Sequence, residues 1–367
     1  MRQALAAGPF LGTLVLTLLA IAALFMADTF LAKMDRNESR VEASRLFEQG
    51  RVLMGWGENA EAIKRLKDAL SIDRGNRDYL RTLAGAQLAA GDTRGAEATL
   101  GDLLESEPTD GLASLLMGRV LAKEGRFAEA ISYFHRAIYG RWSKDAEQNR
   151  RRSRFELIDL LAKQNFKEEL LAELLPVQED APQDIKTRTH IGELFLMAGS
   201  PARAAEVFRG ILRDAPENAD GYKGMGEAEF TRGNYRASQR DFQTALRLAP
   251  DDPEVLRQLD RCDEVLQLDP TLRGLGSEER FRRSLRLVEL TLNEVSQCAK
   301  PNPPAELREL LAKATRALKT QGRAGRQIEL SEANLDLAEQ LWQLRKRECN
   351  LSLMDTPLAL VMVRLAQ

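Results

Sequence analysis

The sequence predicts an all-α protein, and three observations lead to this class. The chain has 367 residues, of which 44% are hydrophobic and 29% are charged, as in folded proteins. Its apolar residues are rich in alanine and leucine and include few aromatics, which favours helices over strands. Glycines, alanines and prolines recur at a fixed spacing of 34 residues, and a long charge-free segment lies near the N-terminus. We expect three parts: residues 1–42, 43–268 and 277–367.

The composition disfavours several classes of function. Basic and acidic residues nearly cancel, 53 against 55, so no global field would draw the chain onto nucleic acid. The two histidines have no carboxylate or cysteine at ligand spacing, and no phosphate loop, dinucleotide fingerprint or serine nucleophile motif is present in the sequence. We therefore expect a protein that is not an enzyme, with no cofactor, no metal site and no nucleic-acid partner.

The first part, residues 1–42, predicts a transmembrane anchor followed by a juxtamembrane helix. No charged residue lies between Gln3 and Ala27, and the apolar run over residues 9–27 has the roughly 20 residues that a membrane-spanning helix needs. A cleaved signal peptide would have a shorter apolar core of about 7 to 15 residues and a small residue where Phe25 stands. We therefore expect a retained single-pass anchor in preference to a cleaved signal.

The charges that flank this segment leave its orientation open. Arg2 precedes the apolar run, whereas four basic residues follow it, and this count favours a cytoplasmic C-terminal part. Those four residues alternate with four acidic ones, however, and long domains are exported largely regardless of such counts.

The middle part, residues 43–268, is an internal repeat. Gly57, Gly91 and Gly125 are each 34 residues apart. Each period reads as two helices joined by a short turn, because glycine tolerates a positive φ at the end of the first helix and proline ends the second. One interval contains about six extra residues, so the unit between residues 145 and 182 is degenerate.

Two segments show the pattern most fully: "GELFLMAGSPARAAEVFRGILRDAP" from Gly192 and "GEAEFTRGNYRASQRDFQTALRLAP" from Gly226. Their small, aromatic and proline positions match the signature of the tetratricopeptide repeat, and the chain resembles that family. The resemblance implies an α-solenoid of about six helix-turn-helix units, a right-handed superhelix that ends in a capping helix from Asp252.

The resemblance also implies an inner groove, lined by the first helix of every unit, that binds a protein or peptide partner. The groove positions carried over from the family are Phe47, Arg51, Arg81, Leu115, Arg119 and Lys123 in the first units, and Lys186, Glu193, Lys223, Glu227 and Phe230 in the later ones. The first set is basic and apolar, which suits an acidic segment. Ordinary solvated charges are the other interpretation of these residues.

The last part, residues 277–367, predicts long helices over 277–298, 304–320 and 327–348, and it matches no named motif. Short loops make consecutive helices antiparallel, so the first and third should run in the same direction and end at similar heights. Cys298 closes the first helix and Cys349 follows the third, which predicts a disulfide between them. Two unpaired thiols in a cytosolic domain are the alternative.

The anchor and the repeats together resemble bacterial membrane-anchored tetratricopeptide-repeat proteins of the cell envelope. This resemblance implies a non-catalytic scaffold in the inner membrane whose soluble, periplasmic part recruits a partner for assembly or maintenance of an envelope complex. The alternative is a regulator with the same fold that faces the cytoplasm, as the lysine and arginine count allows. The oligomeric state is not determined by the sequence.

Overall fold

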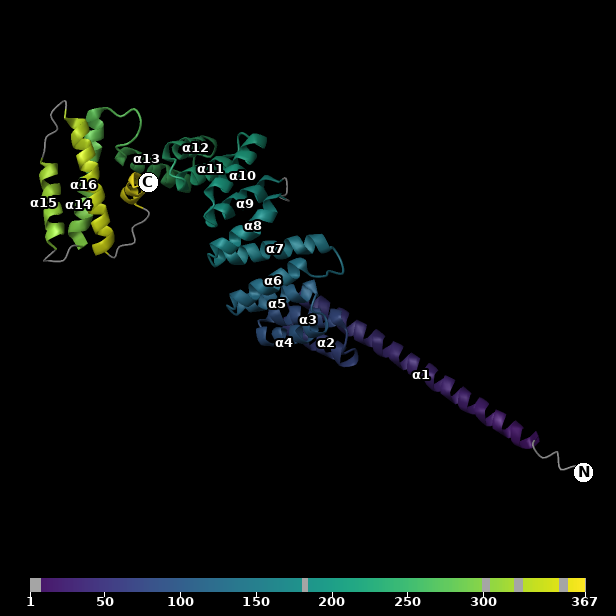
Figure 1. Ribbon diagram of the computed structural model, residues 1–367. Coiled ribbons are helices and arrows are strands. Elements are labelled where there is room, and N and C mark those ends of the chain that lie inside the picture. Colours follow the sequence, from purple (N-terminus) through teal and green to yellow (C-terminus); the bar gives the residue numbers. More distant parts are fainter. Residues whose placement is uncertain (1–7, 180–183, 299–303, 320–325, 350–355, 367) are drawn as a thin grey trace, which may run out of the picture. The chain divides into compact units, whose positions relative to one another are not determined.

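The computed structural model describes residues 8–179, 184–298, 304–319, 326–349 and 356–366. Its regular elements in these ranges are the helices α1 to α17 (Figure 1). The chain divides into two compact units, residues 1–160 and residues 161–367, and each unit is described by itself. The predicted all-α class is confirmed.

The first unit is built from helix pairs. Its helices are α1 (Gly8–Gly55), α2 (Asn59–Ile72), α3 (Arg77–Ala90), α4 (Thr93–Ser106), α5 (Gly111–Lys123), α6 (Phe127–Tyr139) and most of α7 (Ala146–Lys163). Helix α1 packs on α2, α3 on α4 and α5 on α6, and each pair also packs on the next. This is the repeated helix-turn-helix arrangement that the 34-residue period predicts.

The turns inside the pairs depend on a left-handed residue. Gly57, Gly91 and Gly125 have φ angles of 81°, 84° and 77°, a region that glycine enters without a Cβ penalty. In the degenerate unit the equivalent residue is Asn165, with a φ of 58°, and asparagine is the next most tolerant residue there. The six extra residues are accommodated before it, by a loop at residues 140–145 and by an 18-residue α7.

Close approach of the paired helices explains the other recurring glycines. A Cβ built on Gly118 would lie 3.1 Å from the Phe134 ring. The equivalent Cβ on Gly226 would lie 2.7 Å from Phe242, and one on Gly224 would lie 2.1 Å from Phe208. A large aromatic of the second helix therefore rests directly on the backbone of a first helix, and larger side chains are excluded there.

Helix α1 is continuous from the apolar N-terminal segment into the first repeat. Its apolar side chains between residues 14 and 30 are 52% to 72% exposed: Leu14, Leu16, Leu18, Leu19, Ile21, Leu24, Phe25, Met26 and Phe30. Over the part of the chain that the structure describes, no helix meets the length and apolarity needed to cross a membrane. The expected anchor at residues 9–27 is thus not confirmed, and the side chains of residues 9–13 and 15 lie outside the described set.

The second unit continues the helix pairs and then changes architecture. Its repeat helices are α8 (Lys167–Glu179), α9 (Ile185–Met197), α10 (Pro201–Asp214), α11 (Ala219–Thr231) and α12 (Tyr235–Leu248), followed by α13 (Pro253–Leu268). Helix α9 packs on α10 and α11 on α12, while the first helices α9, α11 and α13 also contact one another in sequence. The last repeats of this unit thus present α9, α11 and α13 on one face.

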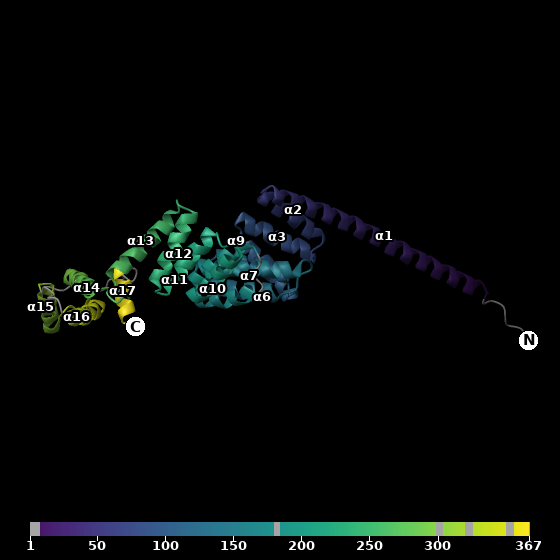
Figure 2. The same cartoon turned by 90° about the horizontal axis from the view of Figure 1, so that it is seen from above.

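Three long helices form a bundle at the end of the second unit: α14 (Ser277–Cys298), α15 (Ala305–Leu318) and α16 (Gln327–Glu348) (Figure 2). Helices α14 and α16 are parallel, because partners 50 residues apart meet twice along them. Ser277 donates to Gln327 at 2.9 Å, and Asn334 donates to Ser284 at 3.0 Å. At the far end of the two helices a disulfide joins Cys298 and Cys349, with Cα atoms 5.6 Å apart.

A short C-terminal helix, α17 (Pro357–Leu365), joins this bundle to the last repeat. Leu358, Ala359, Val361 and Met362 are buried in one hydrophobic cluster with Tyr235 of α12, Val265 of α13 and the facing residues of α14 and α16. The Arg364 guanidinium lies 2.7 Å from the carboxylate of Asp269, which is 1% exposed. Helix α17 is therefore packed into the hydrophobic core of the second unit.

Candidate functional site

The predicted groove residues of the first unit are mostly engaged by neighbours. Phe47 stacks on Tyr79 with ring centroids 4.4 Å apart, and the Arg51 guanidinium lies 5.9 Å from the Phe47 centroid. Leu115 is only 3% exposed and packs in the core, so it does not line an open surface. Lys123 is exposed, and its Nζ lies 3.4 Å from the carbonyl oxygen of Leu88.

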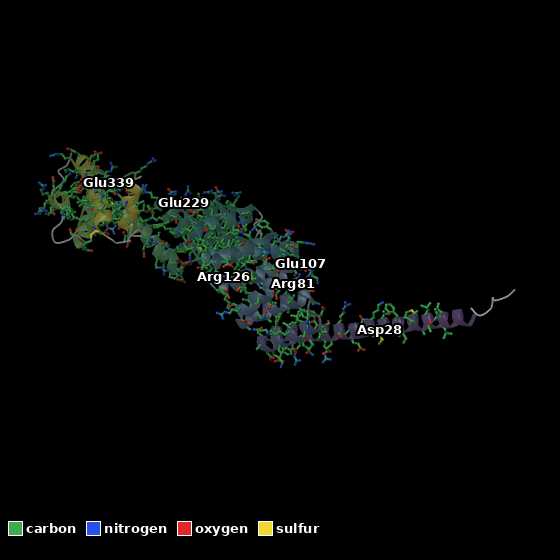
Figure 3. The ribbon with its side chains drawn as sticks, turned by 60° about the horizontal axis from the view of Figure 1, so that its bottom comes forward. Asp28, Arg81, Glu107, Arg126, Glu229 and Glu339 are labelled. Carbon is green, nitrogen blue, oxygen red and sulfur yellow. A yellow bond between two sulfur atoms is a disulfide. The ribbon has the colours of Figure 1, made fainter. Side chains whose placement is uncertain are left out.

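Two of the expected groove arginines form ion pairs across repeats. Arg81, labelled in Figure 3, donates from Nε to Asp110 at 2.8 Å, and the Asp110 side chain is only 5% exposed. Arg119 donates to both carboxylate oxygens of Glu156, from Nε at 2.7 Å and from Nη2 at 2.6 Å. Asp110 and Glu156 lie 29 and 37 residues from these arginines, and the sequence analysis did not name them. The basic character expected for this half of the groove is thus largely neutralised inside the unit.

The predicted residues of the second unit fall into two groups. Lys186 and Glu193 are exposed on α9. Lys223 forms ion pairs with Asp252 and Glu254, at 3.2 and 3.3 Å. Glu227 and Phe230 instead line a common pocket.

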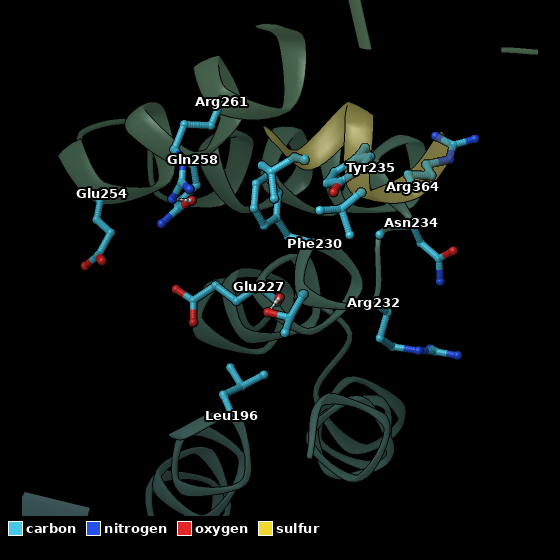
Figure 4. A pocket seen from close by; sticks show the side chains of 14 residues that line it. Leu196, Glu227, Phe230, Arg232, Asn234, Tyr235, Glu254, Gln258, Arg261 and Arg364 are labelled. Carbon is cyan, nitrogen blue, oxygen red and sulfur yellow. Dashed lines mark hydrogen bonds between the residues drawn. The ribbon is translucent and has the colours of Figure 1, made fainter. Parts of the chain in front are cut away.

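This pocket has a volume of about 810 Å³ and lies entirely within the second unit (Figure 4). The face formed by α9, α11 and α13 contributes Leu196, Glu227, Phe230, Thr231, Glu254, Gln258 and Arg261. The turn after α11 contributes residues 232–234, α12 contributes Tyr235, and α17 contributes Leu360, Val363 and Arg364. Its size lies in the range of ligand sites that admit several side chains of a bound segment.

Aromatic and aliphatic side chains form the middle of the pocket. The Phe230 and Tyr235 rings meet edge to face, with centroids 5.2 Å apart. The Arg261 guanidinium lies 5.1 Å from the Phe230 centroid, at the distance of a cation–π contact. Leu360 and Val363 of α17 provide aliphatic surface that the sequence analysis missed, although the apolar run "PLALVMVRL" after Thr356 is the signal that predicts a helix there.

Most charged groups of the pocket already have partners. Arg232 pairs with Glu229 at 2.8 Å, and Arg364 pairs with Asp269. Figure 4 shows the Glu227 and Glu254 carboxylates toward one side of the pocket and the Arg232 and Arg364 guanidinium groups toward the other. The pocket therefore has an apolar middle and two ends of different charge.

Glu227 differs from these paired groups. Within the described residues its carboxylate accepts no hydrogen bond and joins no ion pair; Lys223, one helical turn earlier, is held by Asp252 and Glu254. Burial raises the pKa of Glu227 to about 7; the positive charge of Lys223 acts against this shift, and the negative charges of Glu254 and Glu193 add to it. Glu254, the other acid that lines the pocket, pairs with Lys223, whereas Glu227 forms no ion pair among the described residues.

No group of three or more histidine, cysteine, aspartate or glutamate side chains in the described part of the chain is arranged to hold a metal ion.

Comparison with known proteins identifies the class of the repeat. Residues 53–120 match the family model described as tetratricopeptide repeat. Residues 53–120 therefore carry the tetratricopeptide pattern, and the helix pairs outside this range share its 34-residue period.

Particular relatives are more distant. The Protein CTR9 homolog of Arabidopsis thaliana is 33% identical over 94 residues, which make up 22% of this chain and 9% of that protein. The DnaJ homolog subfamily C member 3 of Rattus norvegicus is 22% identical over 266 residues, 68% of this chain and 50% of that protein. The chain thus spans half or less of these relatives.

Among solved structures, the chain is similar to YrrB, described as a TPR protein with an unusual peptide-binding site. The two are 19% identical, and the match covers 52% of this chain and 96% of that chain with a TM-score of 0.41.

Proposed function

We propose that the protein is a non-catalytic scaffold whose repeats bind a peptide segment of a partner protein in the pocket formed by α9, α11, α13 and α17. The observation that carries this proposal is the pocket itself: about 810 Å³ beside the first helices of the last repeats, with an apolar middle between charged ends. A peptide segment supplies both apolar and charged side chains, and grooves of this size recognise such segments through a few anchors.

The decisive experiment measures peptide binding after a large side chain has been placed in the pocket. Peptides of 12 residues are selected from a random displayed library against the full chain, and their affinities are measured by fluorescence anisotropy. Thr231 is exposed in the pocket, so Thr231→Trp should block binding by tenfold or more without disturbing the core. Gln243→Trp, at an exposed position of α12 outside the pocket lining, is the matched control. Equal affinity for the wild type and Thr231→Trp would overturn the proposal.

We further propose that residues 9–27 anchor this scaffold in a bacterial inner membrane. The row of exposed apolar side chains between Leu14 and Phe30 supports this proposal, because so much exposed apolar surface is unfavourable in water. Anchoring would confine the pocket near the bilayer, so that a weak peptide contact suffices for recruitment to an envelope complex.

The periplasm is the compartment that we propose for the soluble part. Support comes from the Cys298–Cys349 disulfide, since such bonds persist in oxidising compartments and are reduced in the cytosol. A regulator with the same fold that faces the cytoplasm is the alternative, and it requires both thiols to be reduced in cells.

A preference of the first unit for an acidic segment remains a separate hypothesis. It depends on Arg51 and Lys123, whose side chains are exposed, more than on Arg81 and Arg119, whose ion pairs are partly buried. Arg51 also pairs with Glu48 at 3.0 Å, but both of these side chains are exposed. Reversing the charge at Arg51 and Lys123 should abolish binding of an acidic partner, and unchanged binding would remove this hypothesis.

A further inference from the structure

The charges near Glu227 come from three successive helices. Helix α9 contributes Glu193, and α11 contributes Lys223 and Glu227 itself. The other two are Asp252, the N-cap residue of α13, and Glu254 within α13. Lys223 is the cation of this group, and its ammonium lies 3.2 Å from Asp252 and 3.3 Å from Glu254. The Lys223 ammonium is thus paired with Asp252 and Glu254, and Glu227 lies near three acids without an ion-pair partner among the described residues.

The arginines that line the pocket do not supply this cation. Arg232 pairs with Glu229, and Arg364 pairs with the buried Asp269. Arg261 lies over the Phe230 ring. Leaving Glu227 unpaired is costly in a half-buried position, and a cation from outside would remove that cost.

The aromatic wall suits the same kind of ligand group. Phe230 is one helical turn from Glu227, and its ring already accepts a guanidinium, that of Arg261. A long basic side chain combines an aliphatic stem, which can lie along Phe230 and Leu196, with a charged end.

We propose that the pocket selects a partner segment carrying a lysine or arginine, whose cation pairs with the Glu227 carboxylate while its stem lies against the apolar middle. This inference rests on the proposed function, because it names the chemistry of the segment that the pocket binds. It goes beyond the acidic-peptide preference expected for the first unit and concerns a different surface.

The test compares matched peptides on the full-length chain. A selected 12-residue peptide that contains lysine or arginine is synthesised with those residues unchanged, or all replaced by glutamine, or all replaced by glutamate. At pH 8 the unchanged peptide should bind about tenfold more tightly than the glutamine version, and the glutamate version should bind most weakly. Glu227→Gln should remove the tenfold advantage and leave the glutamine version unaffected. Glu217→Gln, at an exposed loop position, is the control.

The pH dependence of the affinity provides a second test with the same peptides. Protonation of Glu227 removes the charge that recognises the cation, so affinity for the unchanged peptide should fall between pH 8 and pH 6, whereas the glutamine version should show no such fall. Equal binding of the three peptides, or an undiminished lysine preference in Glu227→Gln, would overturn the inference. Such a result would leave the proposed function standing as long as Thr231→Trp still blocks binding, so the two failures are distinguishable.

Discussion

Arg81 and Asp110 link two neighbouring repeats of the first unit through a mostly buried ion pair. The Asp110 carboxylate also accepts a hydrogen bond from the backbone N–H of Ala113 at 3.0 Å, so it caps α5. Asp110→Asn can retain the cap but leaves the guanidinium without its buried counter-charge. We expect a loss of about 2–3 kcal/mol in the free energy of unfolding.

Urea unfolding at pH 7 measures this effect. The control is Asp78→Asn, because Asp78 also pairs with Arg81 but its side chain is 77% exposed. Loss of the exposed Asp78–Arg81 pair should lower the free energy of unfolding by about 0.5 kcal/mol or less. An equal loss in the free energy of unfolding for the two variants would contradict the claim that the buried Arg81–Asp110 pair is the more stabilising one.

Glu227 makes a pH-dependent contribution to stability. Its pKa in the folded chain, about 7, lies above the ordinary value of 4.5, so folding favours the protonated form. Stability should therefore be unaffected by this group below pH 4.5, fall as the pH rises toward 7 and stay lowered above it. The full penalty is of the order of 3 kcal/mol. Glu227→Gln should raise the free energy of unfolding at pH 8 by about 1–3 kcal/mol and have little effect at pH 4.5, while equal effects at the two pH values would contradict this assignment.

For single residues, the repeat pattern predicted positions in the groove better than it predicted the ion-pair partners of those residues. The repeat phase placed Glu227 and Phe230 on the pocket-facing side of α11. It could not indicate that Asp110 and Glu156 neutralise Arg81 and Arg119, because those contacts depend on how one repeat packs on the next. It also placed Leu115 in the groove, although packing within the repeat buries that residue.

At the scale of the helices, the closeness of the packed aromatic ring predicts how much a glycine-to-alanine substitution costs in stability. An alanine Cβ at Gly118 would lie 3.1 Å from Phe134, whereas one at Gly224 would lie 2.1 Å from the ring of Phe208. Gly118→Ala should be nearly neutral, since the better helix propensity of alanine offsets a small shift of the ring. Gly224→Ala should cost about 2–3 kcal/mol through overpacking. Thermal unfolding of both variants tests this order, and a reversed order would show that the aromatic contacts are not limiting.

The helix pairs themselves were predictable because a turn glycine and a small-to-aromatic contact leave periodic marks in the sequence. The degenerate unit obscured this period for a physical reason. Asn165 replaces the turn glycine, and extra residues at 140–145 and in α7 shift the spacing before it. Two consecutive helices, α7 and α8, nevertheless occur there, and the turn between them keeps the left-handed conformation at Asn165.

On the scale of the whole molecule, the disulfide closes the bundle at the end of the second unit. Cys298 and Cys349 are 51 residues apart in sequence, and a loop of this length corresponds to roughly 4 kcal/mol of stabilisation through the unfolded state. A reductant should therefore lower the unfolding temperature of the oxidised protein. The Cys298→Ser, Cys349→Ser double variant should already unfold at the lower temperature and not respond to reductant. If reductant also lowered the unfolding temperature of this double variant, the disulfide would not be the cause of the effect.

The location of the soluble part can be tested with the same thiols. In intact cells, Cys298 and Cys349 should remain unlabelled by thiol reagents until a reductant is added, as expected for a periplasmic disulfide. Ready labelling of both residues, without reductant, by a reagent confined to the cytosol would support the cytoplasm-facing alternative.

The pocket combines elements that no single stretch of sequence indicates. The repeat pattern predicts α9 and α11 as groove helices and α13 as a capping helix, but α17 begins about 90 residues after the end of α13 in sequence. Its placement depends on the cluster formed by Leu358, Val361 and Met362 with the bundle, and on the pair between Arg364 and Asp269. These long-range contacts explain why the site was only partly predicted.

Hydrogen exchange of the full chain, with and without a selected peptide, tests the central claim most directly because it locates the bound segment on the protein. We predict that added protection is concentrated in α11, the turn at residues 232–234, the start of α12, α13 and α17, and that Thr231→Trp abolishes it. Protection confined to the outer helices or to the first unit, with no change in α11 and α13, would contradict the claim that this pocket is the partner-binding site.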